Sequence, residues 1–177
     1  MAITSLKKLL YPLLVGLMLG WLQTGLFFQF TSTFSAGFRT YLMITLCWLA
    51  GSALGVSYGT KLPLSISMLL ILSLCCYWLC AVLLLKTPFD TGLWPIYGGL
   101  VILVGVFPGL FFARMAPFYR ARSLFLLENN GFIVGLASGT LLLLFMGRAA
   151  LWLIPAALAL ILFVLREPSN KPAMLTE

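Results

Sequence analysis

The chain has 177 residues, of which 62% are hydrophobic and only 8% are charged, and it contains no histidine. A soluble domain of this length could not cover its core with so little polar surface, so we expect the chain to lie in a lipid bilayer. Its formal charge of +7 is scattered through short gaps between apolar stretches. This spacing argues against a nucleic-acid partner, which requires a basic face or tail.

Hydropathy predicts six membrane spans of about twenty residues, the length that about 30 Å of hydrocarbon requires. In chain order they cover residues 9–30, 41–58, 64–85, 93–113, 124–146 and 149–165. The gaps between them contain Gly, Pro, Ser and charged residues, which are typical of turns. We therefore expect an all-α membrane protein in which residues 1–177 form a single integral membrane domain.

The basic residues predict the orientation of the six spans. Eight of them fall on one side of the membrane and three on the other. The first group comprises Lys7, Lys8, Lys61, Arg114, Arg120, Arg122, Arg166 and Lys171, and the second comprises Arg39, Lys86 and Arg148. Because cytoplasmic loops carry the excess of Lys and Arg, both termini are expected in the cytoplasm.

Two of the spans carry glycines spaced four residues apart. They are Gly51, Gly55 and Gly59 in the second span and Gly131, Gly135 and Gly139 in the fifth, 80 residues later. The same offset places Gly25 on Gly105 and maps spans one to three onto spans four to six. Since three is odd, the two triplets would cross the membrane in opposite senses, as an inverted repeat.

Glycines four apart lie on one helix face and allow another helix backbone to come close. In this chain such a face has two interpretations. Either it packs inside the six-helix bundle, or it is a partner interface for a second membrane chain.

Few polar residues fall inside the spans, and each is a candidate functional residue because polar groups are costly in lipid. Gln23 lies within the first span, and Glu128, Asn129 and Asn130 lie near the start of the fifth. For Glu128 we expect a helix cap or an ion pair with an arginine of residues 114–122, and a cation or substrate contact is the alternative. Gln23 is expected to form an interhelical hydrogen bond.

Arg114, Arg120 and Arg122 lie in one short gap, with Pro117, Phe118 and Tyr119 among them. Such a stretch can lie at the lipid headgroups and attract anionic lipid, and docking of a cytoplasmic protein is the alternative.

Four cysteines, at positions 47, 75, 76 and 80, lie in apolar spans. No histidine is present to join them in a zinc site, thiolates are strongly disfavoured in hydrocarbon, and the usual axial ligand of haem is missing. We expect packing thiols, no metal and no cofactor.

Three short motifs occur in order along most of the chain. They are Gly51-Ser52-Ala53-Leu54-Gly55, then Gly105-Val106-Phe107-Pro108 followed by Arg114, and then Glu128-Asn129-Asn130-Gly131 with Gly135 and Gly139. Together they resemble the membrane part of the bacterial fused major-facilitator/spermidine-synthase-like family. The resemblance implies one six-helix half of a major-facilitator fold in the bacterial inner membrane.

Two features depart from that family. Relatives commonly continue into a soluble synthase-like domain, whereas this sequence shows no GxGxxG signature and no acidic amine site. The loop over residues 55–61 also lacks the acid and the arginine pair of major-facilitator gating loops. No enzyme activity is expected.

Two functions fit these observations. The first is a non-catalytic membrane subunit that packs through its glycine faces on another membrane protein or on a second copy of itself. The alternative is a small-solute transporter, for a polyamine-like or other cationic solute, formed by two copies of the six-helix unit.

Overall fold

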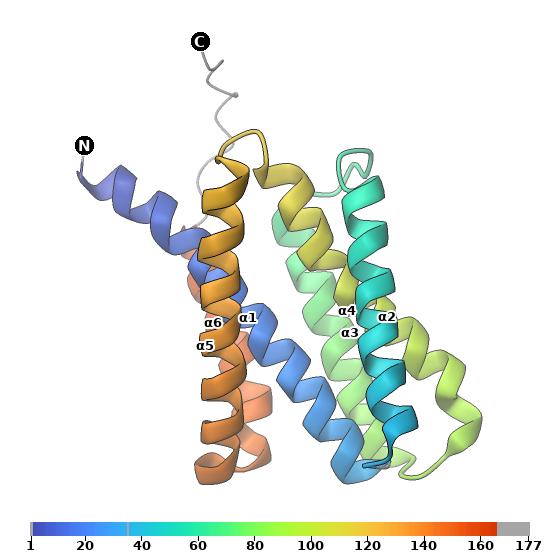
Figure 1. Cartoon of the computed structure of the whole chain (residues 1–177). Helices are drawn as coiled ribbons and strands as arrows, with labels where there is room; N and C mark the ends of the chain where they lie inside the picture. The colour runs from blue at the N-terminus through green and yellow to red at the C-terminus, as the bar shows by residue number, and fades with distance from the viewer. Residues whose placement is uncertain (1, 35, 166–177) are drawn as a thin grey trace.

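The computed structural model describes residues 2–34 and 36–165, with side chains from residue 7 onwards. This part of the chain is helical throughout, apart from short connections (Figure 1). The elements are α1 (Ala2–Thr33), α2 (Phe38–Tyr58), α3 (Ile66–Lys86), the 3-10 turn η1 (Thr91–Leu93), α4 (Trp94–Met115), α5 (Ala121–Met146) and α6 (Arg148–Leu165). Six of these helices are long and apolar enough to cross a membrane, which confirms the predicted all-α fold with six spans.

Most helices are longer than the apolar stretches from which they were predicted, because backbone hydrogen bonds can continue past the end of the hydrocarbon. Local residues determine where each helix begins and ends. At the start of α3 the Met68 amide donates to the Ser65 hydroxyl at 3.2 Å, so Ser65 is the N-cap and the helix begins at Ile66. Between α5 and α6 the single residue Gly147 adopts a φ of 62°, which glycine tolerates without a steric cost.

The helices form two long pairs that join segments far apart in the chain. α1 packs along α5, and α2 packs along α4, and these two contacts are the most extensive in the bundle. α3 lies against α4, and α6 lies against α1. In Figure 1, α5 crosses in front of the tilted α1 and α6 lies behind α5, while α2, α3 and α4 lie on the right.

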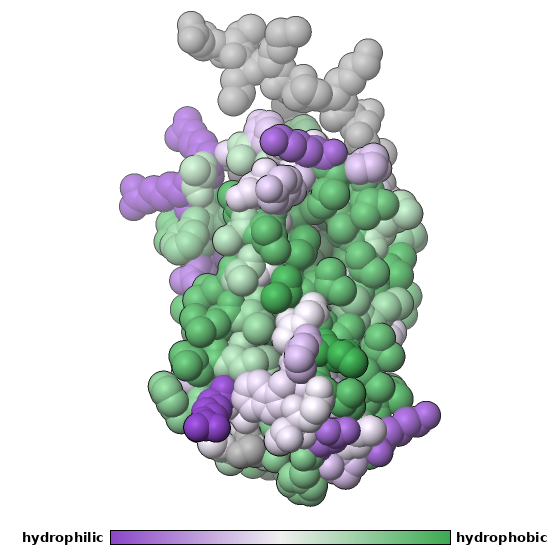
Figure 2. All heavy atoms as spheres, turned by 90° about the vertical axis from the view of Figure 1, so that its right-hand side faces the viewer, coloured by the Kyte–Doolittle hydropathy of each residue, from purple (hydrophilic) through white to green (hydrophobic). Residues whose placement is uncertain are grey.

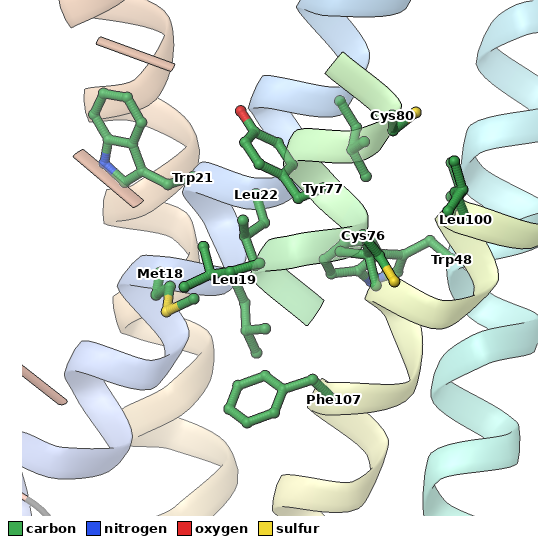
Figure 3. Packing of buried hydrophobic residues seen from close by; sticks show 14 of the residues in the cluster. Met18, Leu19, Trp21, Leu22, Trp48, Cys76, Tyr77, Cys80, Leu100 and Phe107 are labelled. Carbon is green, nitrogen blue, oxygen red and sulfur yellow. The ribbon is translucent and has the colours of Figure 1, made fainter. Parts of the chain in front are cut away.

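The interior is built mainly by α1, α3 and α4. About 67% of the apolar window of α1 is buried, against 17% for α5 and 28% for α2. In Figure 3, Leu19 and Leu22 of α1 lie on the side of that helix that faces Tyr77 of α3 and Phe107 of α4. The buried share of α6 is 33%, and α2, α5 and α6 are therefore the outer helices.

The surface has the distribution of a membrane protein. Figure 2 shows a broad hydrophobic band between two ends at which hydrophilic side chains gather. Successive helices run in alternate directions, so the predicted basic residues divide between these ends as expected, with Lys7, Lys61 and Arg120 at one and Arg39 and Arg148 at the other. Arg166 and Lys171 of the first group lie outside the described residues.

Candidate functional site

The contact between α2 and α4 is a close approach of two backbones. A Cβ atom added at Gly51 or Gly55 would overlap carbonyl groups of α4, and one added at Gly109 would overlap the Ser52 carbonyl of α2. The Ser52 hydroxyl donates to the Gly105 carbonyl at 3.1 Å and fastens the two helices together. Small residues on both helices therefore allow the contact.

The contact between α1 and α5 is also a close approach of two backbones. Cβ atoms added at Gly131 and Gly135 would overlap carbonyls of α1, and one added at Gly16 would overlap the Glu128 carbonyl of α5. Trp21, which Figure 3 shows on the side of α1 away from Tyr77, donates from its indole Nε1 to the Ser138 hydroxyl at 3.1 Å. Each pair thus combines backbone contact with one hydrogen bond between the helices.

Both glycine runs are used inside the chain. Their expected packing role is confirmed, and the expectation that they form a partner interface is wrong. The residues concerned are Gly51, Gly55, Gly59, Gly131, Gly135 and Gly139. The sequence shows which face is small but not which helix covers it. The covering helices had a detectable signal, because Gly16 and Gly20, like Gly105 and Gly109, have the same spacing.

The correspondence of Gly25 with Gly105 is also wrong. Gly25 faces the Tyr77 side chain, whereas Gly105 faces the backbone of α2 at Trp48. The residue of α1 that matches Gly105 in its pairing role is Gly16, 89 positions earlier, although α2 and α5 match at an offset of 80. The difference lies mainly in the helices, because α1 extends 17 residues past Gly16 whereas α4 extends 10 residues past Gly105, and a single offset cannot describe it.

Glu128 lies in the contact between α5 and α1, at the level of Gly16, and only 8% of it is exposed. Within the described residues its carboxylate has neither an ion pair nor a hydrogen bond. The expected cap or ion pair is therefore wrong. Arg120 is the N-cap residue of α5, more than one turn before Glu128, and Arg114 has other partners.

The other predicted polar residues are not gathered around Glu128. Asn129 is half-buried, and Asn130 is exposed on the surface of α5. Gln23 is half-buried on α1, about 10 Å along the helix axis from the level of Gly16. In the described part of the chain Gln23 makes no hydrogen bond to another helix, contrary to expectation. These four residues therefore differ in burial and in their level along the bundle.

Arg114 binds the C-terminal end of α2 and does not extend to lipid headgroups. Its guanidinium donates to three backbone carbonyls that follow α2: Nε to Gly59 at 2.9 Å, Nη2 to Leu62 at 2.6 Å, and Nη1 to Leu64. The planar fork of donors suits carbonyls that diverge in this way. The headgroup expectation is wrong for Arg114, while Arg120 and Arg122 are exposed and keep that prediction.

A buried polar relay at the opposite end of the bundle was not predicted. Gln29 is 7% exposed, and its Nε2 donates to the Tyr77 hydroxyl at 2.9 Å. Tyr77 in turn donates to the Leu151 carbonyl at 2.8 Å. The relay ties α1, α3 and α6 together. A glutamine in the first span and a tyrosine in the third were the only sequence signals for it.

The relay predicts a loss of stability in Tyr77→Phe. Without the hydroxyl, the Gln29 amide and the Leu151 carbonyl stay buried and lose their partner, so the free energy of unfolding should fall by about 2 kcal/mol. Tyr41→Phe is the matched control, because Tyr41 is exposed and its ring contact with Phe27 survives the change. Thermal unfolding of both variants in detergent measures the difference. Equal melting temperatures of the two variants would show that the relay does not stabilise the fold.

The four cysteines differ in their burial. Cys76 and Cys80 are buried in the core, Cys47 is half-buried and Cys75 is exposed. Within residues 2–34 and 36–165, no three side chains of the kinds that bind metals come together.

The six long apolar helices define a multi-pass membrane protein. Comparisons of the chain with protein-family models, with characterised proteins and with solved structures gave no match.

Proposed function

We propose that this protein is a non-catalytic membrane subunit that packs against another membrane chain through the outward face of α5. One observation carries the proposal. Asn130 places an exposed side-chain amide on a membrane-spanning helix, and this amide has no hydrogen bond within the described residues.

The depth of Asn130 makes this amide costly in lipid. α5 has 26 residues and is about 39 Å long, whereas the hydrocarbon layer is about 30 Å thick. Asn130 is the tenth residue of the helix, about 13 Å from its start, so it lies well inside the hydrocarbon when α5 is centred. A polar group at this depth favours a contact with another helix, with a gain of about 1 kcal/mol.

The residues around Asn130 form a surface that another helix can cover. Ile133, Val134, Ala137 and Leu141 are exposed and lie at helical spacing from Asn130, so they share its face. We call these five residues the α5 stripe. Its partner is another membrane protein or a second copy of this chain. In the second case two Asn130 amides can pair, since each both donates and accepts.

The alternative is a transporter for a small cationic solute, and Glu128 is the observation in its favour. A buried carboxylate inside a membrane protein is typical of an ion or substrate path. The geometry nevertheless favours the subunit. Glu128 lies in a contact where the α1 and α5 backbones touch, so a solute could not pass there unless the two helices separated.

The helix pairing supports the expected inverted repeat. The second helix of each triplet packs along the first helix of the other, as α2 does with α4 and α5 with α1. With the resemblance to the bacterial fused major-facilitator/spermidine-synthase-like family, this makes half of a major-facilitator fold our proposed relationship. The bacterial inner membrane, with the start of α1 in the cytoplasm, is the proposed location.

The α5 stripe predicts the behaviour of three variants. Asn130→Leu and Ile133→Trp should each weaken association by about tenfold, because one loses the polar contact and the other adds bulk. Leu54→Trp should leave association unchanged, since Leu54 is exposed on α2, away from the stripe. Energy transfer between labelled copies in liposomes tests a second copy, and cross-linking in native membranes tests a foreign partner.

Two results would contradict the subunit proposal. One is association that is equally strong in all three variants. The other is uptake of a cationic solute by proteoliposomes that is lost in Glu128→Gln, which would support the transporter.

A further inference from the structure

A small cavity with a mostly apolar lining and one polar wall lies at the end of the bundle that carries Arg39, Lys86 and Arg148. Its volume is about 10 Å³, and α1, α3 and α6 line it. This volume suffices for one group of the size of a water molecule. Gln29, Ser32 and Thr33 of α1 form its polar wall, and Arg148 and Trp152 contribute from the start of α6.

The polar wall offers hydrogen-bond acceptors. The Ser32 hydroxyl donates to the Gln29 backbone carbonyl at 3.2 Å, and the Thr33 hydroxyl donates to the same carbonyl. The Gln29 amide nitrogen is bonded to Tyr77, whereas Gln29 Oε1 is buried and has no partner in the described residues. The hydroxyl hydrogens are therefore used, and what remains on α1 is three oxygen atoms that can accept. A small group rich in N–H donors fits this wall.

The rim of the cavity favours an anion. Arg148 is exposed, and its guanidinium is a donor without an ion pair in the described part of the chain. It is also the first residue of α6, where the free amides and the helix dipole favour an anion. Leu84 and Leu85 of α3 form an apolar wall beside these polar groups. The site thus combines acceptors inside, a cation at the rim and an apolar flank.

We propose that this cavity binds the headgroup of an ethanolamine phospholipid. The primary ammonium occupies the cavity and donates to Gln29 Oε1 and the two hydroxyl oxygens. The phosphate, two carbons away, binds Arg148 and the start of α6, and the acyl chains lie along α3. A choline headgroup does not fit, because its three methyl groups are too large for the cavity and carry no N–H donor.

Native mass spectrometry of the full chain in detergent, with phosphatidylethanolamine and phosphatidylcholine of equal chain length, tests the proposal. We expect the wild type to retain the ethanolamine lipid and not the choline lipid. Arg148→Gln and Ser32→Ala should each reduce retention, by about tenfold for the arginine. Arg39→Gln is the matched control, since Arg39 is an exposed arginine at the same end that does not line the cavity. Melting temperatures show that each variant is folded.

Equal retention of the two lipids by the wild type would overturn the proposal, and so would equal losses in Arg148→Gln and Arg39→Gln. Competition with soluble phosphoethanolamine distinguishes binding of a lipid headgroup from binding of the free compound. Displacement of the lipid at equal concentration would show that the site takes the free compound, which would contradict a lipid site. Failure to displace it would support the contribution of the acyl chains along α3.

Discussion

Gly109→Ala is expected to separate α2 from α4 and to lower the free energy of unfolding by about 3 kcal/mol, the upper part of the range for an added methyl group in a packed interior. The added Cβ would overlap the Ser52 carbonyl, which belongs to the helix backbone and cannot turn aside as a side chain could. Moving α2 away would also stretch the hydrogen bond from the Ser52 hydroxyl to the Gly105 carbonyl.

Gly99→Ala is the matched control for this variant. Gly99 lies in the same helix, and an added Cβ would meet nothing within 4 Å. Alanine has the higher helix propensity, by up to about 1 kcal/mol, so Gly99→Ala should be neutral or slightly stabilising. Thermal unfolding of both variants in the same detergent measures the contrast. Two variants that melt together would show that the backbones of α2 and α4 do not touch at Gly109.

Arg114→Gln has the second large expected effect. Glutamine is too short and has too few donors to serve three carbonyls at once, so the end of α2 and the loop to α3 lose their hydrogen bonds. Bonds from a charged donor contribute about 1.5–3 kcal/mol each, and they are not additive, so we expect a loss of about 3 kcal/mol. Arg114→Lys should give an intermediate value, because its ammonium is a single point of contact.

Proteolysis can measure the local effect of Arg114→Gln on the loop between α2 and α3. Lys61 is exposed in the loop between α2 and α3, and trypsin cleaves after lysine. Release of this loop should make cleavage after Lys61 faster in Arg114→Gln. Arg122→Gln is the control, since Arg122 is exposed and has no hydrogen bond in the described residues, and its stability should change by less than about 0.5 kcal/mol. Unchanged cleavage at Lys61 in Arg114→Gln would show that the arginine does not hold the loop.

The polar residues show how far sequence reasoning extends. Gln23, Glu128, Asn129 and Asn130 could be named as costly residues in lipid because that property depends on the residue and the span around it. Whether they meet depends on the rotation and depth of each helix. The structure buries Glu128 and exposes Asn130, although the two residues are only two positions apart in one helix.

The hydrogen bonds that join helices span long distances along the chain. Trp21 and Ser138 are 117 residues apart, and Arg114 and Gly59 are 55 residues apart. The sequence contained each of these side chains, but an arginine near the membrane surface has many possible partners. Which three carbonyls Arg114 contacts depends on where α2 ends relative to α4.

The amino-acid sequence alone determined the number of spans, the membrane environment and the faces on which small residues lie. These are local properties, set by the length of apolar stretches and by the helical repeat. Only the tertiary structure decided that α4 and α1 cover the two glycine runs and that Gln29 meets Tyr77. In lipid, apolar side chains gain little by leaving the acyl chains, so helix pairing depends on close backbone contact and a few hydrogen bonds. Those contacts exist only once distant segments have come together.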